Sequence, residues 1–325
     1  MKKLIYLSIL GLLMSNCTTD IKNPDAKVEV EAGTKIGLSK ANQETTPSAP
    51  IKEDEKKSLI TNDLLGFWVG YFKKDDENDY GDKTLFVDDG YMWDRENKIN
   101  ISIDKISDSL IIGHSVVAGN DRPFKGSIRK ESQGSYSVIA KEPGDNKYDG
   151  EFIFTISDKE LTGNWTAYKE IDIKKRKYTL EKRNFSYNPD VMLEYSKGYI
   201  DWNKVKKTNK TEKIDDEFEE WISKEFATAT NLIYEINASN TLLAKSEVEN
   251  LKRGDLTIIR NTIYARHGYS FKHRPLRVFF DAQNWYIPVH TNIKDDFTDL
   301  EKKNIQLLLK YEKNAAEYYD RFGRG

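Results

Sequence analysis

The sequence predicts an α+β protein of several domains, in which a central antiparallel β-barrel or sandwich precedes a small α-helical C-terminal domain. Two changes of periodicity predict this. From about residue 65 to 185 apolar and polar residues alternate, as at Ile99, Ile101 and Ile103, which is typical of half-buried strands. After Pro189 the apolar residues recur every three or four positions, which is typical of helices. With 325 residues, the chain is long enough for two domains and their tails.

Residues 1–16 have the pattern of a secretory signal peptide. Lys2 and Lys3 precede a short apolar run from Leu4 to Leu13. Cys17 follows as the only cysteine, which excludes an intrachain disulfide. The LMSNC segment that ends at Cys17 resembles a bacterial lipobox, which implies that a lipid on Cys17 holds the mature protein at a membrane. The alternative is an ordinary signal peptide followed by an incidental cysteine.

Residues 17–60 are predicted to form a lipid-anchored disordered tether. They are rich in charged residues, Asn, Thr, Pro and Ala, and contain too few large apolar residues to fold on their own. Thr18 stands where an aspartate retains lipoproteins in the inner membrane. The lipoprotein resemblance therefore implies the cell envelope, with the outer membrane favoured, and leaves open whether the protein faces the periplasm or the medium.

Residues 61–186 are predicted to form the antiparallel β domain. Turn signals such as Asp89-Gly90 and Asp149-Gly150 separate about eight or nine short candidate strands. Gly66-Phe67-Trp68 resembles the opening of lipocalin-like barrels, in which the tryptophan closes one end, and Gly163 to Trp165 repeats the spacing. That resemblance implies an interior able to hold a small ligand. The alternative is that both tryptophans simply fill a core.

Residues 187–241 are predicted to be a helical connector. Phe218, Trp221, Ile222 and Phe226 recur at helical spacing, behind the acidic residues 215–217, which suit a helix N-terminus. We expect this apolar face to be part of a core. The lysine-rich residues 204–213 are expected to form a loop.

Residues 242–325 are predicted to be a small helical bundle. Asp255 is expected to cap a helix that ends at Gly268, which can adopt the left-handed conformation. Thr298 and Glu301 have the spacing of a capping box at the start of a long C-terminal helix. Pro275 suits the first turn of a short helix between them.

The pentapeptide from Tyr264 to Gly268, together with Arg260-Asn261 before it and Phe271 after it, resembles the bacterial YARHG domain. The family implies an extracytoplasmic protein and no established activity. Two interpretations of the motif stay open. Arg266 and His267 either stabilise the helix end and pair with Asp281 or Glu301, or they belong to a recognition site for a carboxylate, phosphate or glycan. The candidate binding residues for the second interpretation are Tyr264, Arg266, His267, Gly268, Tyr269 and Trp285.

The sequence predicts a binding or structural role rather than catalysis. HExxH, GxSxG and Walker motifs are absent, so we predict no catalytic residues and no cofactor. The spacing of His267, His273 and His290 matches no metal motif. A formal net charge of −2 argues against nucleic acid as a partner.

We therefore expect a lipid-anchored envelope protein that binds an envelope glycan, a peptidoglycan fragment or a protein partner. Two alternatives are kept. One is a hydrolase of envelope polymer that uses His267 as its acid or base. The other is a carrier of a small apolar ligand in the β domain.

Overall fold

The computed structural model describes residues 63–75, 85–88, 91–94, 96–195, 198–214 and 217–318. The predicted signal peptide, Cys17 and the tether lie outside the described residues. Every element below belongs to one compact unit, Ile51–Gly325. No described helix is both long and apolar enough to cross a membrane.

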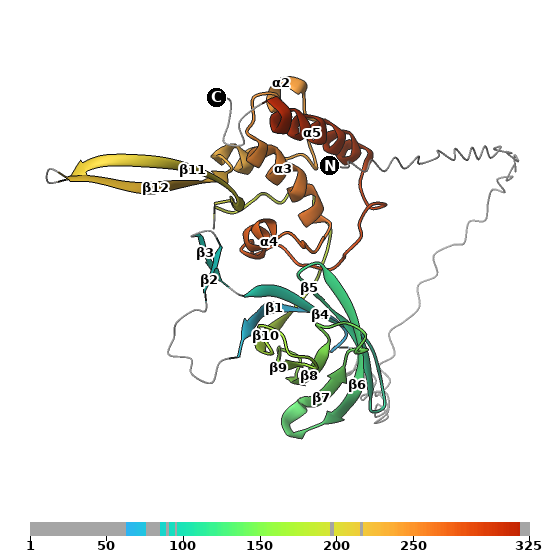
Figure 1. Ribbon diagram of the computed structural model, residues 1–325. Helices are drawn as coiled ribbons and strands as arrows, with labels where there is room; N and C mark the ends of the chain where they lie inside the picture. The colour runs from blue at the N-terminus through green and yellow to red at the C-terminus, as the bar shows by residue number, and fades with distance from the viewer. Residues whose placement is uncertain are drawn as a thin grey trace, which may run out of the picture. The chain divides into compact units, whose positions relative to one another are not determined.

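The β domain is a closed barrel of eight antiparallel strands (Figure 1), which confirms the predicted class and decides for a barrel over a sandwich. Around the barrel the strand order is β1-β10-β9-β8-β7-β6-β5-β4. The strands are β1 (Gly66–Lys74), β4 (Asn97–Ser107), β5 (Leu110–Val117), β6 (Asn120–Lys130), β7 (Tyr136–Lys141), β8 (Gly150–Ile156), β9 (Glu160–Ala167) and β10 (Lys175–Arg183).

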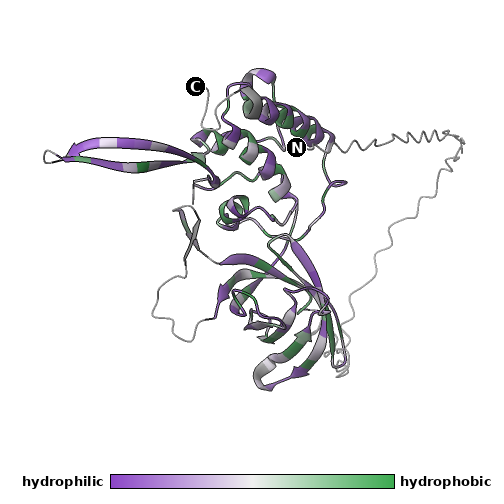
Figure 2. Cartoon of the chain, in the orientation of Figure 1, coloured by the Kyte–Doolittle hydropathy of each residue, from purple (hydrophilic) through white to green (hydrophobic). Residues whose placement is uncertain are grey.

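Side chains fill most of the barrel interior, because every second residue of each strand points inward. Ile99, Ile101 and Ile103 of β4 are at most 1% exposed, as the alternation predicted. Trp68 is fully buried, and its indole N–H donates to the carbonyl of Leu64 at 3.0 Å. Figure 2 shows the hydrophobic residues of the barrel among its strands. Both tryptophans of the two Gly-x-Trp segments belong to this core.

The two ends of the barrel differ in the loops that form them. Because neighbouring strands are antiparallel, the β4–β5, β6–β7 and β8–β9 turns share one end with the start of β1 and Trp68. The β5–β6, β7–β8 and β9–β10 loops share the other end, which we call the barrel mouth.

Two short sheets lie outside the barrel. One pairs β2 (Leu85–Asp88) with β3 (Tyr91–Asp94), and the other pairs β11 (Ile200–Ile214) with β12 (Glu217–Thr228). The second sheet corrects the predicted helical connector over residues 187–241, since the expected helix is strand β12 and the expected loop is strand β11. Among the described residues of this range, only a short 3₁₀ turn, η2 (Asn231–Tyr234), is helical.

The physical reason for this error is the spacing of the apolar residues in β12. Phe218, Ile222 and Phe226 are four residues apart, and a step of four returns to the same side of a strand as well as to the same face of a helix. In the hairpin they stand opposite Lys213, Asn209 and Val205. Phe218 and Ile222 are 73% and 58% exposed, so the expectation of a core stripe was also wrong for these two residues.

The C-terminal region is a small bundle of helices, as predicted (Figure 1). Its helices are α2 (Lys245–Val248), α3 (Arg253–Arg266), α4 (Arg274–Asp281) and α5 (Asp299–Tyr318). Thr298 and Glu301 form the predicted capping box by reciprocal bonds of 3.0 and 3.2 Å. Asp255 lies in the first turn of α3 instead of ahead of it, where its carboxylate accepts from the backbone N–H of Lys252 and Thr230.

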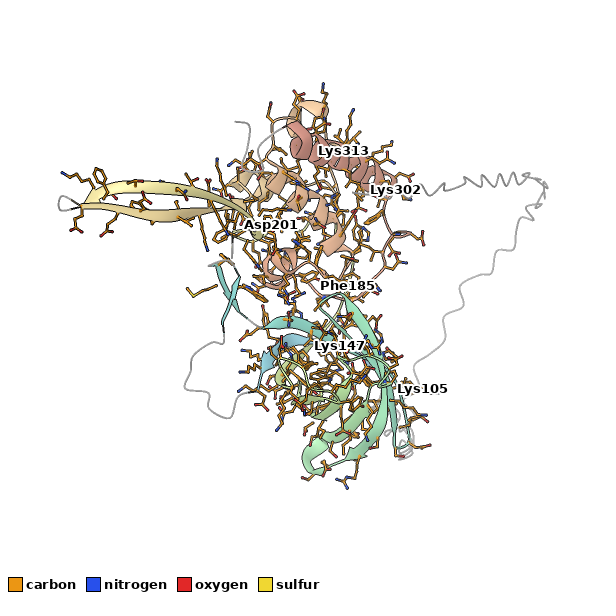
Figure 3. All side chains as sticks on the ribbon, in the orientation of Figure 1. Lys105, Lys147, Phe185, Asp201, Lys302 and Lys313 are labelled. Atoms are coloured by element: carbon orange, nitrogen blue, oxygen red, sulfur yellow. The ribbon has the colours of Figure 1, made fainter. Side chains whose placement is uncertain are left out.

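The bundle packs against the barrel through apolar and polar contacts. Phe185, labelled in Figure 3, belongs to a cluster with Val69, Ile287 and Val289. The backbone N–H of Lys98 donates to Asp281 at 2.9 Å, and both side chains are buried. These contacts bring α4 close to the barrel mouth.

Candidate functional site

Two buried polar clusters are candidates for function, one at the end of α3 and one at the barrel mouth. The end of α3 is fixed by Gly268, whose φ of 69° is the predicted left-handed conformation. Its N–H donates to the carbonyl of Ala265 at 2.9 Å, and the N–H of Tyr269 donates to the carbonyl of Tyr264 at 3.1 Å. This pair of bonds is a Schellman motif, and it directs the chain from α3 into the next segment.

His267 is held by a buried carboxylate. Its Nε2 lies 2.9 Å from Glu301 Oε2, and its ring stacks on Tyr187 with 4.2 Å between centroids. The hydroxyl of Tyr187 donates to the other Glu301 oxygen at 3.0 Å. Burial alone would raise the pKa of Glu301, but the hydrogen bonds from His267 and the Thr298 N–H outweigh it and lower that pKa. Of the two predicted partners, Glu301 is the one that His267 contacts.

Arg266 binds neutral acceptors. Its Nε and Nη2 donate to the carbonyl of Val191 at 2.9 and 2.8 Å, and Nη1 donates to Ser239 Oγ at 3.0 Å. The side chain is 3% exposed, and burial lowers its pKa to about 10. It forms an ion pair with neither Asp281 nor Glu301. We call Arg266, His267, Glu301, Tyr187 and Ser239 the polar lock, since they join α3 to α5 and to the segments before them.

Of the six candidate binding residues, Tyr264 and Tyr269 pack edge-on at 6.1 Å and His267 packs against Phe297, while Arg266 and His267 are buried. Tyr264 stacks on Phe297 at 5.1 Å, and Tyr269 packs edge-on against Phe271 at 5.2 Å. Trp285 packs against Tyr286, and its indole N–H is buried without a partner. In the described ranges, His267, His273 and His290 do not form a group of metal ligands, nor do any three His, Cys, Asp or Glu residues.

The barrel mouth holds a cavity of about 530 Å³. The barrel contributes Phe72, Ser115, Glu142 and Trp165 to its wall, and α4 contributes Arg274 and Arg277. The β7–β8 loop, which contains the Lys147 labelled in Figure 3, lines it as well. In total five basic and four acidic residues line the cavity.

Glu142 is the inward carboxyl of this cavity. Its two oxygens accept from Gly150 N at 2.7 Å, from Trp165 Nε1 at 3.1 Å and from Ser115 Oγ at 3.3 Å. The residue is 6% exposed. Burial raises the pKa of Glu142 to about 7 although these hydrogen bonds oppose the change. Near neutral pH the carboxyl group is therefore partly protonated.

Asp149 lies in the same wall with the opposite electrostatic character. Arg122 donates to both of its oxygens, at 2.9 and 2.7 Å. The backbone N–H of Gly144 donates to the same carboxylate at 2.8 Å, and that of Asn146 at 3.2 Å. Burial would raise the pKa of Asp149, but the bonds from Arg122 and the backbone outweigh it and lower that pKa. Asp149 is therefore an ionised carboxylate, and its hydrogen bonds hold the β7–β8 loop in place.

Arg277 has fewer partners than any of these groups. Its Nη1 donates to the carbonyl of Lys272 at 3.1 Å, and its Nε is buried without a partner. The side chain is 9% exposed and forms no ion pair in the described part of the chain. Arg176, by contrast, donates to the carbonyl of Phe72 at 2.9 Å, with its guanidinium 5.0 Å from that ring.

Sequence reasoning named none of the cavity residues as a site. One signal was present for Glu142. Tyr136, Val138 and Ala140 form the inward face of β7, and the same alternation carries Glu142 inward as a carboxyl at the end of an apolar row. Arg122, Asp149 and Arg277 have no such signal, because their presence around one cavity depends on strand pairing and on the packing of α4.

These observations define an α+β protein with a ligand-sized cavity at the mouth of a β-barrel and a helical domain closed by a polar lock. Residues 230–313 match the family model of the YARHG domain, so the chain carries a YARHG domain in that helical region. The match begins before the predicted boundary at residue 242 and includes η2. No curated protein and no solved structure matches the chain.

Proposed function

We propose that this chain is a lipid-anchored protein of the bacterial cell envelope that binds a small glycan or peptidoglycan fragment in the barrel mouth without transforming it. The cavity is the observation that carries the proposal. Its volume of about 530 Å³ falls within the range of small-molecule sites. Its wall combines aromatic rings with charged and polar side chains, so it is more polar than the usual small-molecule site and suits a polar ligand. The signal pattern and Cys17 support the envelope location.

The wall favours a polar ligand over an apolar one. The interior residues of the barrel, such as Ile99 and Phe154, are packed together as a core, which leaves the cavity at the mouth. Charged side chains converge there, and an apolar ligand would bury them without hydrogen-bond partners. The carrier alternative therefore has less support than a binder of glycans or peptide fragments.

Hydrolysis is the second candidate, and one observation favours it. Glu142 and Asp149 are neighbouring carboxyl groups whose pKa values are shifted in opposite directions, the usual arrangement of an acid and a base. However, Asp149 is fully buried and accepts from Arg122 and two backbone N–H groups, so it is not free to activate water. His267, the acid or base of the earlier hydrolase hypothesis, is 6% exposed and bound to Glu301. Binding therefore has the better support.

The test is retention of envelope fragments by the full chain. Enzymatically digested peptidoglycan and envelope glycan are incubated with the protein, and retained molecules are identified by mass spectrometry and titrated by calorimetry. Val117→Trp fills the cavity from its inward wall. Ile139→Trp, on the 49% exposed outer side of the barrel, is the matched control. We expect Val117→Trp to weaken binding by at least about tenfold, while the control binds like wild type.

Three outcomes would contradict the proposal. Retention of no fragment by wild type would remove the binding role, and equal affinity of Val117→Trp and wild type would place binding elsewhere. Cleavage of the fragments by wild type but not by Glu142→Gln would establish the hydrolase instead.

The envelope anchor has a separate test. Intact mass and detergent partitioning are compared for wild type and Cys17→Ala isolated from native membranes. We expect a lipidated mass that begins at Cys17 and is lost in the variant. A wild-type protein without lipid that partitions into water would contradict the anchor and leave a secreted, diffusible binder.

A further inference from the structure

We propose that the ligand of the barrel mouth carries a compact oxyanion, a carboxylate or a phosphate, and that Arg277 of the YARHG domain is its counter-ion. This inference rests on the proposed function and specifies the chemistry of the ligand. It also gives the YARHG domain a part in a site that the barrel alone does not complete.

Arg277 is a buried cation that forms no ion pair with any residue the structure describes. Transfer of a charge from water into a protein interior is costly unless a counter-charge and hydrogen bonds compensate for it. Arg277 is 9% exposed, and its one hydrogen bond goes to a neutral carbonyl. Its Nε has no acceptor among the residues that the structure describes, although the side chain lines a cavity large enough to admit one. An anion in that cavity would supply both the missing counter-charge and an acceptor for the Nε–H.

The nearest carboxylate on the same helix, Asp281, takes this role only in part, since its charge interacts with that of Arg277 without a hydrogen bond between the two side chains. It lies one turn after Arg277 but forms no ion pair with it, and its oxygen accepts from the backbone N–H of Lys98. The ammonium group of Lys98 donates to the carbonyls of Gln283 and Tyr286 nearby. Burial also raises the pKa of Asp281 to about 7, so it is only partly ionised near neutral pH. Lys98 and Arg277 are therefore two buried cations beside a single carboxyl group, that of Asp281, which is only partly ionised.

Most acidic groups of the cavity wall already have donors. Asp149 is bound by Arg122, and Glu170 pairs with Lys174. Glu142 accepts three hydrogen bonds. Asp172 is the remaining acid, and it is exposed at the rim. The positive charge of Arg277 is therefore not cancelled from across the cavity, and Arg274 adds a second guanidinium to the same helix.

The opposite wall suits the uncharged part of such a ligand. Ser115, Glu142 and Trp165 line the cavity together with Phe152, whose ring lies 6.5 Å from that of Trp165. Aromatic faces beside hydroxyl and carboxyl groups fit a sugar or a small hydroxylated acid, which is apolar on one side and hydrogen-bonding on the other. An acidic saccharide matches both walls, with its oxyanion toward α4.

The test uses pairs of probes that differ mainly in an acidic group. N-acetylmuramic acid is compared with N-acetylglucosamine for a carboxylate, and glucose 6-phosphate with glucose for a phosphate. Each is titrated by calorimetry into the full chain as wild type, Arg277→Gln and Arg129→Gln. The side chain of Arg129 is 81% exposed on the barrel, which makes it the matched control.

We expect at least one acidic probe to bind wild type and Arg129→Gln at least about tenfold more tightly than its neutral partner, since charge-assisted bonds are strong. In Arg277→Gln this preference should disappear, and in Arg277→Lys it should be reduced. Without ligand, Arg277→Gln should unfold at the same temperature as wild type or a higher one, because it removes an unpaired buried charge.

Several results would overturn the inference. Equal binding of acidic and neutral probes by wild type would show that no anion site exists, while binding in the cavity, and with it the proposed function, would stand. A preference that survives in Arg277→Gln would exclude this residue as the counter-ion. Failure of all four probes to bind would also count against it. Loss of thermal stability in ligand-free Arg277→Gln would show that the chain itself already compensates the charge.

Discussion

The polar lock and the wall of the barrel-mouth cavity are both built from buried ionisable groups, but they are completed in different ways. In the lock, Arg266, His267 and Glu301 find all their partners within the YARHG domain and the segment that precedes it. In the cavity, Arg277 keeps a charge and a donor without a partner beside open space. The family motif therefore specifies how the domain is closed, whereas the candidate chemistry lies in residues that no motif names.

The largest expected effect on stability comes from removing the side chain of Glu301, the fully buried carboxylate of the polar lock. Glu301→Ala leaves the Tyr187 hydroxyl and the Thr298 N–H without their acceptor and separates His267 from its carboxylate. Breaking a buried pair of this kind lowers the free energy of unfolding by about 3–5 kcal/mol. Urea denaturation followed by circular dichroism measures the change.

Asp299→Ala is the matched control for this experiment, because Asp299 lies in the same first turn of α5 with a side chain that is 96% exposed. Its cost should stay below about 1 kcal/mol, the usual size of a charge–dipole contribution at a helix end. If Glu301→Ala were as mild as Asp299→Ala, the lock would not be the structural element that the hydrogen bonds indicate.

The next effect is a pH dependence of stability that belongs to the cavity. The pKa of Glu142 rises from an ordinary 4.5 to about 7 on folding, so the folded state holds a proton that the unfolded state has lost. The free energy of unfolding should therefore fall as the pH rises from about 4.5 to about 7, by about 3 kcal/mol for this group. Glu142→Gln should remove that part of the slope.

Asp281→Asn supplies the comparison, since burial also raises the pKa of Asp281 to about 7 from an ordinary 3.8. In Asp281→Asn the free energy of unfolding should change less with pH over the same range, and the difference from wild type should begin at a lower pH. In the double variant the free energy of unfolding should change less with pH than in either single variant. Unfolding curves collected from pH 4 to pH 8 test this. An unchanged slope in Glu142→Gln would contradict the protonation that we infer for the cavity wall.

A smaller effect is expected at the glycine that ends α3. Gly268→Ala places a side chain at a φ of 69°, which costs about 1–2 kcal/mol. The new Cβ would also lie 3.0 Å from the ring of Phe185 and 3.2 Å from the carbonyl of Ile287. Gly134→Ala separates the two contributions, because Gly134 has a φ of 82° and nothing within 4 Å of its Cβ position. Equal losses of stability in the two variants would show that the contacts of Gly268 add nothing.

How much of the molecule the sequence could predict depended on whether a pattern was local. The alternation at Ile99 to Ile103 predicted the barrel strands, and the role of Gly268 followed from the need for a residue that adopts positive φ. Glu301 could be placed as a capping residue, but its bond to His267 joins residues 34 positions apart, so the sequence left two partners open.

The cavity was beyond such patterns. Arg277 and Glu142 line the same cavity only because α4 packs at the barrel mouth, and that packing depends on the whole fold. The helix predicted over residues 218–226 was wrong for the opposite reason, since the local pattern of these residues fits both a helix and a strand. The hairpin that replaced the predicted helix leaves Phe218 and Ile222 exposed, and Phe218 gives the smallest of the expected effects.

Phe218→Ala should change the free energy of unfolding by no more than about 0.5 kcal/mol, because Phe218 is 73% exposed in β12 and loses little contact on truncation. Phe279→Ala is the same substitution at a position that is 1% exposed in α4, and it should cost about 3–5 kcal/mol. Denaturation of both variants under the same conditions compares an exposed apolar residue with a buried one. A loss above about 2 kcal/mol for Phe218→Ala would mean that this side chain is covered in solution, and the strand would then carry the core role that a helix was expected to fill.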